Sequence, residues 1–247
     1  METLVVGAGS MGRWLGRVLR ESDQRVSLSF LDATDERARE AAEATDGRAL
    51  RAGTNEQFDL VCVAVPIPAA REAIAAHAGS ARHALLDVTG TMAEPVAAMR
   101  GHAPDCERVS LHPLFAPANE PGNVPVVPDE PGPRTDTVRA ALSARGNALF
   151  ETDAATHDRM METVQARTHA AILAFALATE TVPDRFHTPV SADLDSLVAL
   201  VTDGDPRVYA DIQHAFDGAS DVADAARRLA EADNDAFQQL YTDAGDR

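Results

Sequence analysis

The stretch that decides the fold is ETLVVGAGSMG, residues 2–12. A short apolar run leads directly into the pattern G-x-G-x-x-G, and a segment with helical spacing follows it. In this pattern the first glycine permits a tight turn, the second lets backbone approach a pyrophosphate, and the third allows close contact between helix and strand. The N–H groups that open the helix favour an anion. We therefore predict a dinucleotide-binding turn, with an ordinary tight turn as the alternative. The predicted binding residues are Gly7, Gly9, Ser10, Met11 and Gly12.

Asp32 lies twenty residues beyond Gly12, at the end of a second apolar run, Arg25–Leu31. A carboxylate at this position accepts hydrogen bonds from both ribose hydroxyls and repels a 2′-phosphate. Arg37 and Arg39 come too late to clamp such a phosphate. The pattern favours NAD over NADP, although Asp32 could instead cap the helix that follows.

Apolar runs and helical segments alternate through the first part of the chain, which predicts βαβ units and a parallel sheet. The segment 113–133 contains seven of the 14 prolines, and we expect a loop at the edge of the sheet, in which 124–127 could add a strand. The predicted strands are 2–6, 25–31, 59–65, 84–88, 108–112 and 147–151, and the predicted helices are 34–44, 69–77, 92–100 and 135–144.

Residues 153–247 have a different, helical pattern. The segment 156–182 contains neither Gly nor Pro and ends at Pro183. The fold class is therefore an α/β Rossmann-type domain, residues 1–152, followed by an all-α domain, residues 153–247. The apolar spine of the long helix favours a homodimer formed through the helical domain, with a monomeric bundle as the alternative.

The composition is acidic. Asp and Glu number 39 against 22 basic residues, the formal net charge is −17, and every basic residue is Arg. This charge argues against nucleic acid and anionic lipid as partners. Adaptation to high salt explains both the acidity and the missing Lys better than codon bias does. Two cysteines and no long apolar segment predict a soluble cytoplasmic protein without disulfides. No metal site is predicted.

Three predicted strands end in unusual stretches: VPIP at 65–68, DVTGTM at 87–92 and HPLFAP at 112–117. In open α/β sheets, ligands bind beyond the carboxyl ends of the strands. We therefore place Val65 and Pro66 beside the cofactor, His112 as a candidate base, and the hydroxyls of Thr89 and Thr91 close to it. A structural histidine and helix-capping threonines are the alternatives.

Four stretches together resemble the prephenate dehydrogenase family: DVTGTM, LHPLFAP, HDRMMETVQARTH (157–169) and DPRVYADI (205–212). The resemblance implies that NAD⁺ takes a hydride from the ring carbon bearing the hydroxyl of prephenate. The ring carboxylate leaves as CO₂, and 4-hydroxyphenylpyruvate forms. It further implies that His112 accepts the hydroxyl proton, that Thr89 or Thr91 orients the imidazole, and that Gln165 and His169 face the substrate.

Two departures from the family pattern bear on the substrate. Gly90 stands where the family has a serine, and Leu200 stands near the place of an arginine that receives a substrate carboxylate. Either Arg185 or Arg207 substitutes, with the loop residue Arg185 favoured, or the substrate differs.

Other functions stay open. Arogenate dehydrogenase and a dinucleotide-binding regulator without catalysis are the alternatives to prephenate dehydrogenase. The hydroxyacid dehydrogenases and ketopantoate reductases resemble one another in using a catalytic Lys. The absence of Lys in this chain argues against them.

Overall fold

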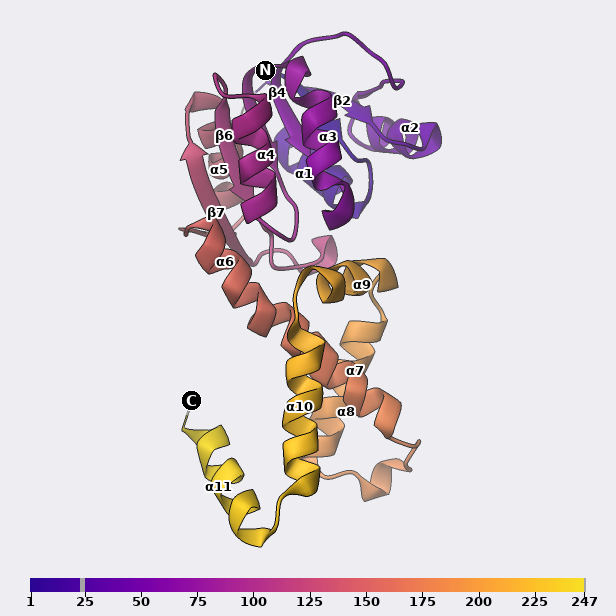
Figure 1. Cartoon of the computed structure of the whole chain (residues 1–247). Coiled ribbons are helices and arrows are strands. Elements are labelled where there is room, and N and C mark those ends of the chain that lie inside the picture. The colour runs from indigo at the N-terminus through magenta and orange to yellow at the C-terminus, as the bar shows by residue number, and fades with distance from the viewer. Residues whose placement is uncertain (23–24, 247) are drawn as a thin grey trace. The chain divides into compact units, whose positions relative to one another are not determined.

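The computed structural model describes residues 1–22 and 25–246. The chain forms two compact units, Met1–Asp158 and Arg159–Arg247 (Figure 1). The helix α6 (Ala154–Met161) begins in the first unit. Its residues up to Asp158 therefore belong with the α/β unit, whereas the sequence pattern had placed the change at 152/153.

The first unit contains an eight-stranded sheet in the order β3-β2-β1-β4-β5-β6-β7-β8. All neighbouring strands are parallel except β6 and β7. This confirms the predicted α/β fold class. The strands are β1 (Glu2–Val6), β2 (Ser27–Leu31), β3 (Arg48–Ala49), β4 (Phe58–Val63), β5 (Ala81–Asp87), β6 (Glu107–Leu111), β7 (Asn123–Glu130) and β8 (Ala148–Glu151).

The proline-rich segment contains an interior strand, β7. The prediction of a loop at the sheet's edge was therefore wrong there, whereas the strand that 124–127 could add is confirmed. Strand β7 pairs antiparallel with β6 and parallel with β8, so it is an interior strand. Prolines lack the N–H that a central strand normally donates. Here the register shifts opposite Pro128, and Pro125 takes part through its carbonyl, which accepts a hydrogen bond from the backbone N–H of His112 at 3.1 Å.

Helices cover both faces of the sheet (Figure 1). One face carries α1 (Ser10–Arg20), α2 (Asp35–Ala44) and α5 (Pro133–Ala144), and the other carries α3 (Ala70–His77) and α4 (Ala93–His102). Because successive strand residues point to opposite faces, each apolar strand contributes to two cores. Short 3₁₀ turns complete the unit: η1 (Ile67–Ala69), η2 (Ala78–Ser80) and η3 (Pro117–Asn119).

The second unit is helical. The predicted continuous helix 156–182 is divided: α6 passes into a π-helical turn, η4 (Glu162–Arg167), then α7 (Thr168–Ala178), and helix ends there. The remaining elements are η5 (Asp184–Phe186), α8 (Pro189–Thr202), α9 (Pro206–Ala215), α10 (Gly218–Glu231) and α11 (Asn234–Gly245).

Side-chain caps fix the starts of three of these helices. Thr188, Asp205 and Asp233 accept hydrogen bonds from first-turn N–H groups of α8, α9 and α11. Such caps satisfy donors that a helix start leaves unpaired.

Candidate active site

The glycine loop follows the carboxyl end of β1. Gly7 has φ +96°, and a Cβ there would lie 2.2 Å from the carbonyl oxygen of Ala64. A Cβ on Gly12 would lie 1.9 Å from the carbonyl oxygen of Gly7. Only glycine fits at these two positions. Gly9 has no such neighbour within 4 Å and precedes the first residues of α1, Ser10 and Met11. The loop therefore presents open backbone and a helix N-terminus, which suit a pyrophosphate.

Asp32 joins the ends of β1 and β2. Its Oδ2 accepts a hydrogen bond from the backbone N–H of Ala8 at 2.8 Å, and its Oδ1 accepts one from Thr34 at 2.9 Å. Each carboxylate oxygen keeps a second acceptor site, so the group can also accept from ribose hydroxyls. Val65 follows β4, where its Cγ1 lies 3.0 Å from the position of a Cβ on Gly7, and Pro66 comes next. These residues fit a dinucleotide.

His112 follows β6 directly and is buried. Its Nδ1 lies 2.9 Å from Nε2 of His157, and Nδ1 of His157 lies 2.8 Å from Oδ1 of Asp158. The two imidazoles meet edge to face, with centroids 5.1 Å apart. The three side chains, which we call the His–His–Asp relay, thus form one continuous line of polar contacts within the first unit.

The carboxylate of Asp158 is held by a helix N-terminus. Its two oxygens accept hydrogen bonds from the backbone N–H groups of Met92 at 2.9 Å and Ala93 at 3.0 Å, where α4 begins. Burial alone would raise the pKa of Asp158, but the bonds from His157, Met92 and Ala93 outweigh burial and hold the pKa below its usual value. The carboxylate is therefore ionised at neutral pH and acts as an acceptor.

The chain of contacts assigns the protons. Because Asp158 accepts, His157 donates through Nδ1, and a neutral His157 then has a lone pair at Nε2. With His157 neutral, His112 donates from its own Nδ1 to that lone pair, which leaves Nε2 of His112 as the acceptor. Such a partner on one ring nitrogen fixes the role of the other.

The protonation state of His112 agrees with this assignment. Burial, and then the neighbouring His157, lower the pKa of His112 to about 3, while Asp158 acts in the opposite sense. The imidazole is therefore neutral near pH 7, which leaves one of its ring nitrogens with a lone pair.

The turn after β5 borders the acceptor nitrogen. A Cβ built on Gly90 would lie 3.8 Å from Nε2 of His112 and 2.9 Å from Cδ1 of Ile67. The hydroxyl of Thr89 contacts Oδ2 of Asp87 at 2.6 Å and the carbonyl of Thr91 at 3.0 Å. Thr89 thus acts within the turn, and His157 is the residue in contact with Nδ1 of His112.

Asp87 is fully buried at the carboxyl end of β5. Burial raises its pKa to about 6, against the opposing hydrogen bonds from the backbone N–H and hydroxyl of Thr89, and Asp158 raises it further. This carboxyl group therefore changes charge near neutral pH, close beneath the turn that carries Gly90.

The second unit contains the other predicted substrate residues. Gln165 lies within the π turn, and His169, one turn later, packs edge to face on Tyr209 with centroids 4.8 Å apart. Burial lowers the pKa of His169. Arg185 is exposed, with its guanidinium 5.2 Å from the centroid of the Phe186 ring, and Leu200 is 63% exposed.

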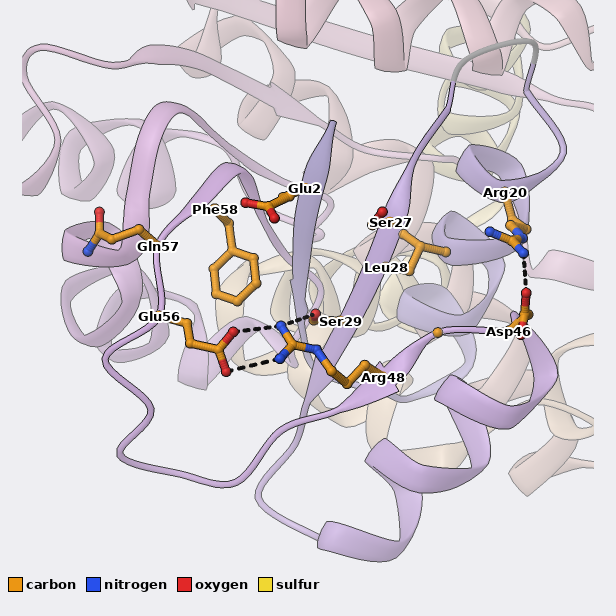
Figure 2. Close-up of a pocket in the computed structure, with 11 residues that line it drawn as sticks. Glu2, Arg20, Ser27, Leu28, Ser29, Asp46, Arg48, Glu56, Gln57 and Phe58 are labelled. Carbon is orange, nitrogen blue, oxygen red and sulfur yellow. Dashed lines mark hydrogen bonds and ion pairs between the residues drawn. The ribbon is translucent and has the colours of Figure 1, made fainter.

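A cavity of about 540 Å³ also opens in the first unit (Figure 2). It lies at the amino ends of β1, β2 and β4, opposite the glycine loop. Its charges are already paired: Arg48 donates to both carboxylate oxygens of Glu56 and to Ser29, and Arg20 pairs with Asp46. The cavity is therefore not the candidate site.

Sequence reasoning missed two parts of the site. In the sequence, the dipeptide His157-Asp158 stands out only as part of a motif, and Asp87 only as the start of a stretch. His112 and His157 are 45 residues apart, so no local pattern indicates that they touch.

A glycine loop and a buried acceptor imidazole at the carboxyl ends of parallel strands define a Rossmann-type dehydrogenase. The model for the prephenate dehydrogenase nucleotide-binding domain matches residues 15–123. A 4-amino-4-deoxyprephenate dehydrogenase of Streptomyces pristinaespiralis is 30% identical over 266 residues, covering 97% of this chain and 88% of that protein. The chain belongs to the prephenate dehydrogenase family.

Further similarities extend this result. A probable arogenate/prephenate dehydrogenase of Methanocaldococcus jannaschii is 25% identical over 85% of this chain and 51% of that protein. The crystal structure of a prephenate dehydrogenase from A. aeolicus, in complex with hydroxyphenyl propionate and NAD⁺, has the same fold. Its TM-score is 0.71 at 16% identity, covering 100% of this chain and 92% of that one.

The described residues, 1–22 and 25–246, lack two further features. No helix among them is long and apolar enough to cross a membrane. They also contain no group of three or more His, Cys, Asp or Glu side chains arranged to hold a metal ion.

Proposed function

We propose that the protein catalyses the NAD-dependent oxidative decarboxylation of prephenate to 4-hydroxyphenylpyruvate. The observation that carries this proposal is the His–His–Asp relay, which leaves Nε2 of His112 as an acceptor beside Gly90. The glycine loop and Asp32 would hold NAD⁺, which supplies the hydride acceptor when bound.

The proton has a defined destination in this reaction. As the ring carbon loses its hydride, Nε2 of His112 accepts the proton of the ring hydroxyl, and the ring carboxylate leaves as CO₂ with its bonding electrons passing into the ring. His112 then returns the proton to the ring oxygen, which gives the hydroxyl of 4-hydroxyphenylpyruvate. Two hydrogens and one carboxyl group are thus accounted for. A positioned base of this kind contributes about 10²–10⁴ in rate.

Replacing His112 tests the proposal. His112→Asn keeps polarity but not basicity, so kcat should fall by about 10²–10⁴ while the Kd for NAD⁺ stays unchanged. NADH formation is the measurement. Full activity in the variant would place the chemistry elsewhere, and no NADH from the wild-type protein with any substrate of this class would favour the regulator without catalysis.

The substrate side chain and ring substituent define the alternatives. Arogenate differs from prephenate only in carrying an amino group in place of the keto group, and nothing at His112 separates the two. Parallel assays with both substrates, at matched concentrations, decide between them.

Gly90 favours a second candidate, the amino-substituted ring for which the S. pristinaespiralis relative is named. A ring oxygen that becomes a carbonyl accepts hydrogen bonds and gains from a donor beside it. A ring nitrogen that becomes an iminium has no lone pair to accept with, and glycine contributes no side-chain donor. Faster turnover of 4-amino-4-deoxyprephenate than of prephenate would replace the first proposal.

Arg185 is our proposed partner for a substrate carboxylate, and Gln165 and His169 are the other proposed substrate contacts. A charge-assisted bond to a carboxylate contributes about 1.5–3 kcal/mol. Arg185→Ala should raise KM for prephenate roughly tenfold, and Arg207→Ala tests the alternative partner for the carboxylate. Normal KM values in both variants would contradict this role.

We also infer a homodimer formed through the second unit. Large apolar side chains there are exposed, among them Leu177 at 88%, Val190 at 70% and Phe186 at 65%. Exposed apolar groups gathered on one unit mark an interaction surface. Light scattering coupled to gel filtration should give the mass of two chains. The cytoplasm remains our expected location.

A further inference from the structure

The π turn is the feature of the second unit that the proposed chemistry leaves unexplained. The backbone N–H of Thr168 reaches back to the carbonyl of Thr163, five residues earlier, and the hydroxyl of Thr168 contacts the same carbonyl at 2.9 Å. A π turn accommodates one extra residue, costs regular hydrogen bonding, and is found frequently at functional sites. Contacts from other elements of the fold must therefore stabilise the π turn.

Two neighbouring helices contact this turn directly. Nε2 of Gln213, on α9, donates to the carbonyl of Ala166 at 2.9 Å. Gly218 opens α10 so close to the turn that a Cβ there would lie 2.5 Å from both Cβ of Ala166 and the backbone nitrogen of Arg167. Nε of Arg167 also donates to Asp221 of α10 at 2.7 Å. We call these three contacts the π-turn clamp.

The same face of α9 also contacts the first turn of α7. Tyr209 and Gln213 are four residues apart, so they lie on one face of α9. Tyr209 packs on His169, while Gln213 binds the turn that contains Gln165. One helix face thus fixes the backbone around both predicted substrate residues.

We propose that Gln213 and Gly218 are positioning residues that hold the π turn and thereby set the direction of Gln165 and His169. This inference rests on the proposed function, which assigns Gln165 and His169 to the substrate. Neither Gln213 nor Gly218 touches the reacting atoms in this proposal, and both act through the turn.

Two variants and two matched controls test the proposal. Gly218→Ala forces α10 away from the turn, and Gln213→Met keeps the length of the side chain but removes its donor. Gly245→Ala and Gln239→Met change the same residue types on α11, where Gly245 has space around it. The first pair should raise KM for the turned-over substrate about tenfold, with kcat changed less than threefold and NAD⁺ binding unchanged. The controls should match the wild type.

A double-mutant cycle separates positioning from general destabilisation. If Gln213 acts through Gln165, then Gln165→Ala should add little to the loss already caused by Gln213→Met. Additive losses in KM, or equal losses in the control variants, would overturn the proposal.

Hydrogen exchange distinguishes failure of this inference from failure of the proposed function. Amides of residues 162–169 should exchange at least tenfold faster in Gln213→Met than in Gln239→Met, whatever the substrate. If no substrate of the class is oxidised, the proposed function fails while the clamp is still judged by exchange. Unchanged exchange in both Gln213→Met and Gly218→Ala would overturn the clamp itself.

Discussion

Nδ1 of His112 lies 2.9 Å from Nε2 of His157, and this contact links the end of β6 to α6 within one unit. Asp158 extends the link to the N-terminus of α4, where it accepts two backbone hydrogen bonds. The proposed base is thus oriented by an imidazole whose own orientation is set by a carboxylate and a helix start.

Replacing His157 tests that orientation. Glutamine places its amide oxygen at about the position of Nε2 and still accepts from His112, whereas leucine leaves a buried N–H of His112 without that acceptor. An unsatisfied buried donor is unfavourable by about 1–3 kcal/mol. We expect kcat/KM of His157→Gln to stay within about tenfold of the wild type and that of His157→Leu to fall further, by roughly tenfold or more.

Steady-state rates from pH 5.5 to 8.5 serve as the check for this pair. Because burial and His157 lower the pKa of His112 to about 3, His112 itself should produce no acid limb in this range. Equal activity in His157→Gln and His157→Leu would contradict the relay.

Asp87 makes the stability of the fold depend on pH. Its folded pKa is raised from 3.8 to about 6 by burial, so the folded state binds more protons than the unfolded state between about pH 4 and pH 6. Stability contributed by this group is therefore present at low pH and lost as pH rises through that window. A shift of this size corresponds to a few kcal/mol, of order 1.4 per pKa unit.

The Asp87→Asn variant isolates this effect, because His112, whose lowered pKa acts in the opposite direction, is present in both proteins. The stability of Asp87→Asn relative to the wild type should increase between about pH 4 and pH 6 and be constant above. Urea unfolding at pH 4.5, 5.5 and 7 measures it. A difference independent of pH would show that the buried carboxyl does not titrate in this window.

The sequence alone predicts those parts of the structure that depend on a local pattern of residues. The glycine loop and the buried strands were located correctly because each depends on neighbouring residues: a turn that only Gly7 permits, or an apolar run covered on both faces. The fold class and the family resemblance follow from these patterns, and both are confirmed.

The features that the sequence did not predict depend on contacts between residues far apart in the chain. Strand β7 is predicted only as a possible short strand, 124–127, because its prolines oppose strand formation. Its full length and its interior place depend on pairing with β6 and β8. The π turn has the same apolar spacing as an α-helix, and the contacts that hold it come from residues more than 40 positions later. The relay likewise joins residues far apart in sequence.

We expect the preference between NAD⁺ and NADP⁺ to depend on Asp32. A carboxylate at the ribose repels a 2′-phosphate, so kcat/KM with NAD⁺ should exceed that with NADP⁺ at least tenfold, or roughly 1.4 kcal/mol. Asp32→Ser should narrow the ratio. Because Asp32 also binds the N–H groups of Ala8 and Thr34, the same variant should weaken binding of both cofactors. Comparable efficiency with both cofactors in the wild-type protein would refute this role.

Salt should stabilise the fold. The formal charge of −17 leaves many surface carboxylates without a basic partner, and the second unit, although shorter, holds about half of the excess. Repulsion among exposed charges is screened over about 10 Å at 0.1 M salt and about 3 Å at 1 M. Salt also screens the existing surface ion pairs, such as Arg13 with Glu40, but each pair contributes at most about 1 kcal/mol to stability. Net repulsion therefore decides the sign of the effect of salt on stability. The Tm should therefore rise markedly between dilute buffer and molar KCl, and reversing the charge of Asp243, which is exposed on α11, should reduce that rise. Thermal scans at constant pH measure both effects. A Tm independent of KCl would remove the high-salt explanation for the acidic surface and leave codon bias to account for the absent Lys.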